Sequence, residues 1–252
     1  MDLRAIYQNA EHIIDKYGFY DGVDSNAVDD IWSPGGQLSW QTSAESLEIL
    51  SASSDDSANG TGAQQVQVTG LDGNWGIQNE TVTLDGTSAV SLTKTFLRVY
   101  RMRVVRRGTY TASNLGNITL RVASGGATRA QIRYDATFGG QGSTEMSHYS
   151  VPAGYNAYLT QFHIEVEASK PVDFYAFVRI NNGKFTSPIG GQYFTPVKFR
   201  AVSGDVNDEI QIPQRFPEKS DFWARAKATG ATTGIVEVRY QIALVRNGKA
   251  IA

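Results

Sequence analysis

The sequence of 252 residues contains no cysteine. This absence excludes a disulfide framework, a cysteine nucleophile and thiolate-ligated zinc, but it leaves the cellular compartment open. No run of about 18 apolar residues is present, so the sequence predicts no transmembrane helix. The first residues lack a basic stretch followed by an apolar core, so we expect no secretory signal and a protein made in a cytoplasm.

The sequence also lacks a large net charge and the common catalytic motifs. The formal net charge of −2 at pH 7 argues against a surface built as a whole for nucleic acid. There is no P-loop, no dinucleotide-binding glycine fingerprint and no G-x-S-x-G elbow. His12, His148 and His163 show neither a metal-ligand spacing nor an obvious carboxylate orienter nearby in the sequence. We therefore expect no enzyme activity, no cofactor and no bound metal.

Residues 21–30 form an acidic stretch that invites comparison with a calcium loop. Asp21, Asp24, Asp29 and Asp30 supply its carboxylates. The stretch does not fit the EF-hand template, which needs oxygen ligands at alternate positions, glycine at position 6 and a final glutamate. We interpret it as a solvated acidic loop.

The sequence is rich in short alternating stretches separated by turns. Apolar and polar residues alternate with period two within 63–75, 80–86 and 89–105, and Asp-Gly pairs supply turns between them. Over 156–167, the period places Tyr158, Thr160, Phe162, Ile164 and Val166 on one face. The spacing predicts an all-β fold with two β-sandwich or jelly-roll-like parts, preceded by one N-terminal amphipathic helix.

The glycine cluster at 138–142 is the best candidate boundary between the two parts. We therefore predict an N-terminal helical arm and connector over residues 1–36, a first β domain over 37–138 and a second β domain over 143–252. The small and polar residues of 51–62 predict an exposed loop.

An amphipathic helix is predicted over residues 2–17, with Ile6, Ile13 and Ile14 on its apolar stripe and Gly18 just beyond its end. Two interpretations are open. The helix can dock on the chain's own sheet, or it can act as an arm that packs on a neighbouring subunit. Its terminal position and short length favour an arm, since such a helix is marginal without a partner surface.

Five arginines lie within the ten residues of 98–107, inside a predicted strand. Period two places Arg101, Arg103 and Arg107 on one face and Arg98 and Arg106 on the other. A solvated edge strand protected by charge is one interpretation. A contact with another protein is the second, because arginine beside tyrosine and methionine is typical of interfaces. Binding to nucleic acid or to an anionic glycan is the third.

Several stretches resemble a family of virion structural proteins from tailed, marine-type bacteriophages, with coverage of roughly 28–245. They begin with residues 28–36, Val-Asp-Asp-Ile-Trp-Ser-Pro-Gly-Gly. The others are residues 58–63, 66–75, 80–90, 96–100, 116–119, 151–159 and 216–221. The resemblance implies a non-enzymatic structural component of a virion, and it implies no functional residues.

With this resemblance, we predict a capsid-decorating or tail/connector assembly protein that forms homo-oligomers, contacts other virion proteins and is located in the virion. The predicted subunit interface comprises Arg101, Arg103, Arg107, Ile6, Ile13 and Ile14. We expect no membrane contact and no nucleic acid. The alternative is a carbohydrate- or receptor-binding β-sandwich that presents an exposed aromatic platform, for which Trp40, Trp75 and Trp223 are the candidates.

Overall fold

The computed structural model describes residues 3–110, 113–181, 192–208, 213–230 and 233–249. These residues are mostly antiparallel strands with one short helix, which confirms the predicted all-β class. The chain divides into two compact units. Met1–Gln37 together with Met146–Ala252 form unit 1, and Leu38–Glu145 form unit 2. No described helix is long and apolar enough to cross a membrane.

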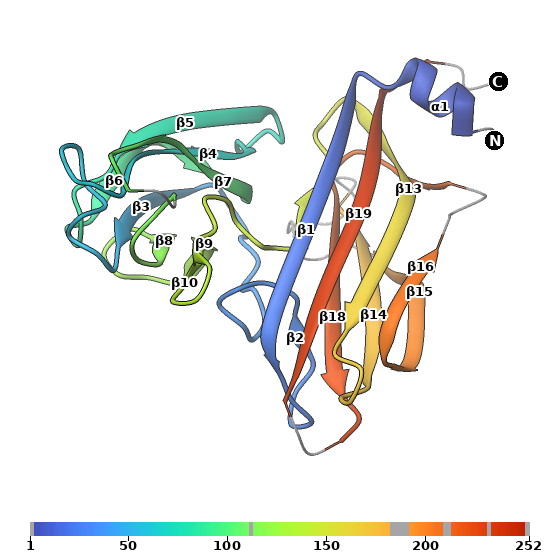
Figure 1. Ribbon diagram of the computed structural model, residues 1–252. Coiled ribbons are helices and arrows are strands. Elements are labelled where there is room, and N and C mark those ends of the chain that lie inside the picture. Colours follow the sequence, from blue (N-terminus) through green and yellow to red (C-terminus); the bar gives the residue numbers. More distant parts are fainter. Residues whose placement is uncertain (1–2, 111–112, 182–191, 209–212, 231–232, 250–252) are drawn as a thin grey trace. The chain divides into compact units, whose positions relative to one another are not determined.

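Unit 1 contains two five-stranded sheets (Figure 1). The first has the order β1-β19-β13-β16, with β17 also paired to β13. Its strands are β1 (His12–Val23), β13 (Tyr155–Val166), β16 (Gly204–Asp208), β17 (Gln214–Phe216) and β19 (Gly234–Arg246). The second has the order β12-β18-β14-β15, with β2 also paired to β18. Its strands are β2 (Asp29–Asp30), β12 (Tyr149–Ser150), β14 (Val172–Ile180), β15 (Gln192–Val202) and β18 (Ser220–Ala228).

Aromatic rings fill the space between these two sheets. Phe222 of one sheet meets Tyr240 of the other with ring centroids 4.7 Å apart, and Phe162 meets Phe174 at 5.6 Å. All four rings are buried. Unit 1 is therefore a β-sandwich in which the inward faces of both sheets share one core.

Unit 2 has a four-stranded sheet, β6-β3-β8-β9, and a three-stranded sheet, β5-β4-β7. The four strands are β3 (Glu45–Ser51), β6 (Val90–Phe96), β8 (Ile118–Val122) and β9 (Thr128–Ile132), and the three are β4 (Ala63–Leu71), β5 (Ile77–Thr83) and β7 (Arg98–Arg107). Both sheets contribute buried apolar residues to the core, among them Leu47, Ile49, Leu120 and Ile132 from the first and Val66, Val68 and Met102 from the second. The predicted strand over 89–105 is in fact two strands. The chain changes sheet at Leu97, between β6 and β7.

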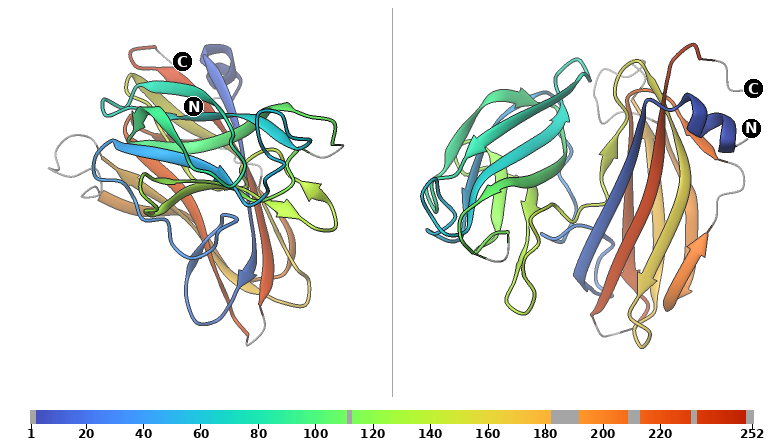
Figure 2. Two further views of the ribbon diagram at one scale, coloured as in Figure 1. Left: turned by 90° about the vertical axis from the view of Figure 1, so that its left-hand side faces the viewer. Right: turned by 45° about the horizontal axis from the view of Figure 1, so that its top comes forward.

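The predicted helix over 2–17 is too long. In the described residues, α1 (Leu3–Asn9) ends early, and residues from His12 onward form β1 along β19. Figure 2 (right) shows α1 at the end of these strands. The apolar spacing is helical, but pairing with β19 overrides the local helix preference from His12 onward. Gly18, expected after a helix, lies inside β1, where an added Cβ would come within 2.8 Å of Ile31 and Ser147.

The predicted face assignment in β13 is wrong for Tyr158. Leu159 lies opposite Ile242 and Gln161 lies opposite Gln241, so Thr160 is an extra residue in a β-bulge. The bulge leaves Phe162 facing the sandwich core but turns Tyr158 to the outer face. There, Tyr158 packs against α1.

The predicted domain boundary at 138–142 is a hairpin rather than a linker. Strands β10 (Tyr134–Asp135) and β11 (Gly139–Gly140) pair across it, and Phe138 at its turn is 82% exposed. The first 37 residues group with the second half of the chain, because β1 and β2 pair with β19 and β18. The division into an arm and connector over 1–36, a first β domain over 37–138 and a second β domain over 143–252 stays a prediction.

Candidate functional site

The arginines of β7 form one row on the outer face of the three-stranded sheet. Arg98 lies opposite Leu71, Arg101 opposite Thr69, Arg103 opposite Gln67 and Arg106 opposite Gln65. These β4 partners are alternate residues of a strand that is regular against β5, so their side chains share one face. Tyr100 and Val105 are extra residues in β7. The predicted separation of Arg98 and Arg106 from the other arginines is therefore wrong, because two bulges change the period.

Arg98 occupies the closed end of the row. Its guanidinium carbon lies 5.2 Å from the ring centre of Trp40 and 5.0 Å from that of Trp75. Its Nη1 donates to the carbonyl oxygens of Gln41 at 2.9 Å and Leu97 at 2.8 Å. Arg98 is 2% exposed. The Arg98 guanidinium is therefore a structural group of unit 2, because two aromatic ring faces and two carbonyl oxygens stabilise its charge.

The rest of the row is increasingly open to solvent. Arg101 is half-buried, and Arg103 and Arg106 are exposed. Arg103 Nη2 lies 3.4 Å from Oε1 of Gln67. Arg107, predicted to extend this face, lies opposite Ala63 and donates from Nη1 to the carbonyl oxygen of Tyr110 at 3.4 Å.

The middle of β7 is not an open sheet edge. The amide of Val104 donates to Gly142 at 2.8 Å, and the amide of Thr144 donates to the carbonyl oxygen of Met102 at 3.0 Å. Arg103 forms a bridge with Ser143 between these bonds. Protection of an open edge therefore does not explain the charge of Arg103.

The three isoleucines of the predicted interface have different surroundings. Ile6 is fully buried in its own chain, in a cluster with Tyr158, Ala243 and Val245. Ile14 is half-buried, and Ile13 is 42% exposed. The apolar surface of Ile6 is thus already covered by unit 1, which leaves Ile13 as the isoleucine with surface to offer a partner.

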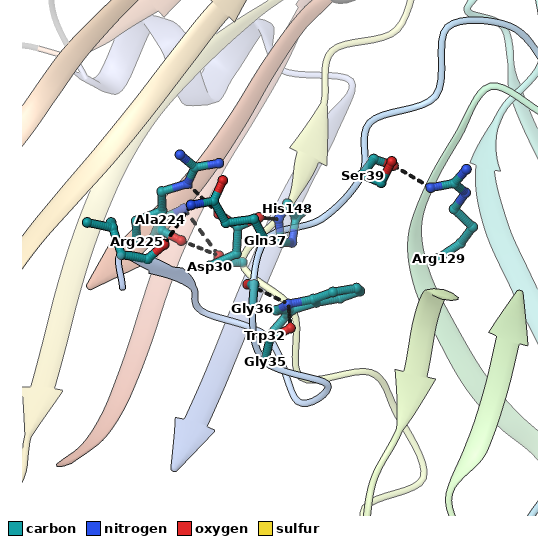
Figure 3. A network of polar contacts seen from close by, with 12 residues as sticks. Asp30, Trp32, Gly35, Gly36, Gln37, Ser39, Arg129, His148, Ala224 and Arg225 are labelled. Carbon is teal, nitrogen blue, oxygen red and sulfur yellow. Dashed lines mark hydrogen bonds and ion pairs between the residues drawn. The ribbon is translucent and has the colours of Figure 1, made fainter. Parts of the chain in front are cut away.

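Residues 28–36, the first stretch of the virion resemblance, form a joint in unit 1 in which residues 29–32 are buried (Figure 3). Asp30 is fully buried, and its carboxylate accepts a bond from Arg225 Nε at 2.5 Å. Asp30 Oδ2 lies 3.2 Å from His148 Nε2. The indole nitrogen of Trp32 donates to the carbonyl oxygen of Gly35 at 2.8 Å, which closes the Ser-Pro-Gly-Gly turn.

This joint holds together the two places where the chain leaves and re-enters unit 1. The amide of Ile31 donates to Ala224, and the amide of Ser147 donates to Ile31, each at 2.9 Å. Trp32 forms an antiparallel bridge with Met146. The segment that runs out to unit 2 and the segment that returns from it are therefore hydrogen-bonded neighbours within unit 1.

Within unit 2, Arg129 anchors the entering segment. Its Nη1 donates to the carbonyl oxygen of Ser39 (Figure 3), and its Nε and Nη2 each lie 2.9 Å from a carboxylate oxygen of Glu45. Such a bidentate pair fixes the direction of both side chains. These contacts are structural.

Sequence reasoning missed two histidine–carboxylate pairs. His148 and Asp30 are 118 residues apart, and both are buried, so a substrate cannot reach them. His163 Nδ1 lies 3.3 Å from Asp205 on the surface. The only sequence signal for the first pair is that Asp30 belongs to the 28–36 stretch. Among the described residues, no group of three or more histidine or acidic side chains could hold a metal ion.

The carboxylates of Asp24 and Asp30 in the acidic stretch 21–30 also make structural hydrogen bonds. Asp24 accepts bonds from the amides of Asn26 at 2.8 Å and Ala27 at 3.3 Å, and these hydrogen bonds lower its pKa. Burial raises the pKa of Asp29, and its acidic neighbours add to the rise. The carboxylate of Asp30 accepts a hydrogen bond from Arg225. The described side chains do not converge on one point as calcium ligands do.

No protein-family model matches this sequence, and no curated protein sequence matches it significantly. Among solved structures, the chain is similar to T=1 particles derived from infectious bursal virus, with 9% identity, a TM-score of 0.27, and coverage of 95% of this chain and 70% of the other. For the infectious bursal disease virus Gx strain the values are 7%, 0.27, 95% and 72%. For the VP2 subviral particle of infectious bursal disease virus they are 8%, 0.23, 94% and 78%.

TM-scores below 0.3 lie under the level at which two chains share a fold.

Proposed function

We propose that this chain is a non-enzymatic structural protein of a virus particle, and more specifically a capsid-decorating or tail/connector protein of a tailed bacteriophage. The observation that carries the proposal is the joint built by residues 28–36. Residues 29–32 of the first stretch of the virion resemblance are buried in unit 1, and Ile31 and Trp32 connect the outgoing segment to the returning one through hydrogen bonds and a β-bridge. A sequence pattern used in this way serves architecture rather than chemistry.

The buried polar residues support a structural role. Asp221 is fully buried and receives bonds from Arg179, Ser150 and Asn181 at 2.5–2.7 Å. Asp30 is likewise saturated by its neighbours. Buried charges that are paired and hydrogen-bonded in this way fix one arrangement of the chain. Such groups are not poised to exchange protons with a substrate.

The carbohydrate-binding alternative loses its predicted platform. Trp75 is 7% exposed and Trp223 is 2% exposed, so neither ring offers a face to a sugar. Trp40 is half-buried against Arg98. A glycan site on this chain would have to be built without these three rings.

The test is the location and copy number of the chain in purified particles. Phage particles from a lysed culture that carries this gene are banded on a density gradient, and quantitative mass spectrometry measures the ratio of this chain to the most abundant particle protein. We expect the chain to band with infectious particles at a fixed ratio. Recovery of the chain only in the soluble fraction, with none in the particle band, would overturn the proposal.

A further inference from the structure

A hairpin of unit 2 presents one aromatic ring to the solvent. Strands β10 and β11 form the two sides of this hairpin, and Phe138 lies at its turn. Phe138 is 82% exposed, and no other large apolar side chain among the described residues is more than 45% exposed. A ring this exposed adds almost nothing to the core of its own unit.

The turn that carries Phe138 is held in one shape by the carboxylate of Asp135. Asp135 Oδ1 accepts hydrogen bonds from the amides of Thr137 at 2.7 Å and Phe138 at 3.0 Å. Both bonds use backbone amides, so they place no demand on the side chain at position 138. A side chain on a rigid turn loses little conformational freedom when it binds a partner. Phe138 is therefore a preorganised apolar anchor.

The stem of the hairpin is tied to the rest of unit 2. Arg133 lies 3.0 Å from a carboxylate oxygen of Asp135 and 3.0 Å from one of Glu145. The amide of Tyr134 donates to the side-chain oxygen of Asn117 at 2.7 Å. These contacts fix the direction in which the hairpin projects from unit 2.

The tip of the hairpin carries no charge. Residues 136–144 read Ala-Thr-Phe-Gly-Gly-Gln-Gly-Ser-Thr. Binding to nucleic acid or to an anionic lipid surface depends on cations at the contact. A single aromatic ring between small neutral residues is suited instead to an apolar patch on a protein.

Unit 1 has such a patch where α1 meets β1. Tyr7 of α1 is 39% exposed and Ile13 of β1 is 42% exposed. The hydroxyl of Tyr7 donates to Gln241 Oε1 at 2.6 Å, and Ile13 lies directly opposite Ala243. Gln241 and Ala243 are two residues apart on β19, so they share one face and are separated by about 6.6–6.8 Å. Tyr7 and Ile13 therefore border the same part of the sheet, and we call them the α1 patch.

The charged groups beside the α1 patch are already paired within their own chain. The carboxylate of Glu11 accepts bonds from Arg246 at 2.9 and 3.0 Å. The carboxylate of Asp15 accepts a bond from Gln241 Nε2 at 2.9 Å. Covering the patch with an uncharged tip therefore leaves no carboxylate buried without a partner, which would be costly.

We propose that Phe138 of one copy of this chain docks on the α1 patch of a second copy. This inference rests on the proposed function and deepens it, since it names a contact between copies in the particle. The two surfaces lie in different units, so the contact is heterologous, and successive copies form a ring or an open array. One aromatic side chain buries about 150–250 Å², well below the roughly 1,200 Å² of a stable complex. The contact therefore acts through avidity, as one of many in an array.

The first test replaces Phe138 by p-benzoylphenylalanine, which keeps an aromatic ring and cross-links on irradiation to the group that it touches. The variant is mixed at high concentration with isotope-labelled unchanged chain, and mass spectrometry maps the cross-linked peptides. We expect cross-links from position 138 to Tyr7 or Ile13 of the labelled chain. The same photoreactive residue at Ile77, which is also exposed on unit 2, should not cross-link to the α1 patch.

Substitutions in the labelled chain test the α1 patch itself. Tyr7→Ser and Ile13→Asp should each lower the yield of this cross-link at least about tenfold, as expected for the loss of an apolar anchor site. The matched control is Ile235→Asp, which makes the same change at another isoleucine of unit 1 that is 40% exposed. It should leave the yield unchanged, and circular dichroism checks that all three variants are folded. An equal loss in the control would show that the patch is not the binding surface and the inference is wrong.

The decisive test maps the cross-link in purified particles that contain the photoreactive variant. We expect covalent dimers of this chain on a denaturing gel, joined from position 138 to the α1 patch. Cross-links only within one copy, or only to a different particle protein, would overturn the inference. A chain present in particles at a fixed ratio but without this cross-link would overturn the inference and leave the proposed particle role standing, whereas a chain absent from particles contradicts that role.

Discussion

One buried carboxylate, that of Asp56, holds a long loop of unit 2 in place. Asp56 is fully buried in the 51–62 segment, which was predicted to be an exposed loop. Its carboxylate accepts bonds from Ser51 Oγ at 2.6 Å, the amide of Ala63 at 2.7 Å and the amide of Gly116 at 3.0 Å. One side chain therefore ties the loop to β4 and to the segment before β8.

Replacing this carboxylate should destabilise unit 2. Asp56→Asn keeps the shape but turns one accepting oxygen into a donor that faces amide N–H groups. We expect the free energy of unfolding to fall by about 2–3 kcal/mol, measured by urea denaturation. The neighbouring Asp55 is exposed, so Asp55→Asn is the matched control and should change stability by less than about 0.5 kcal/mol. Equal effects of the two substitutions would contradict the role of Asp56.

Glu11 gives a prediction about pH. Its carboxylate accepts bonds from Arg246 at 2.9 and 3.0 Å, and this interaction lowers the pKa of Glu11 from 4.5 to about 2. A carboxyl group whose folded-state pKa is lowered stabilises the fold above its unfolded pKa, and the contribution is lost as the pH falls towards the folded value. The melting temperature of the unchanged chain should therefore exceed that of Glu11→Gln at about pH 6. The difference should shrink below about pH 4.5 and vanish near pH 2. A difference that stays constant over this range would contradict the prediction.

The elements show how far the sequence determines this fold. Period-two alternation located β4, β5 and β13 closely, because each keeps one face on a core. The faces beyond Tyr100, Val105 and Thr160 could not be assigned, since a bulge has no residue signature of its own. The helix prediction failed because β19, which captures residues from His12 onward, lies more than 200 residues away. The pairing of Asp30 with His148 was hidden for the same reason.

The N-terminal elements separate two roles that the sequence assigned to one helix. Ile6 of α1 is fully buried against unit 1, whereas Ile13 on β1 is 42% exposed. Ile6→Ala should lower the free energy of unfolding by about 2–4 kcal/mol through loss of packing and a residual cavity. Ile13→Ala should lower it by less than about 1 kcal/mol. Thermal and urea denaturation of the two variants make the comparison, and a larger loss for Ile13→Ala would show that α1 does not dock as described.

At the scale of the whole molecule, unit 2 is an insertion in the sequence of unit 1. Met1–Gln37 and Met146–Ala252 build one unit, and the contiguous Leu38–Glu145 builds the other. The ends of unit 1 on either side of the insertion are held together, because Ser147 bonds to Ile31 and Met146 bridges Trp32. The chain can be cut at this short junction, because the insertion carries its own core.

Residues 38–145 expressed alone should therefore fold. We expect a strand-rich circular dichroism spectrum and a single cooperative urea transition. Residues 146–252 alone should not reach the native state, since they lack β1 and β2, and adding a peptide of residues 1–37 should restore structure. A disordered 38–145 fragment would contradict the division into units.

The distance in sequence between β1 and β19 has a consequence for synthesis. β1 is translated well before β19, because the partner of His12 is Leu244. All of unit 2 is translated in between, and it can fold while β1 still has an unpaired edge. β1 therefore keeps an unpaired edge until β19 has been translated, and an unpaired strand edge can pair with a neighbouring chain.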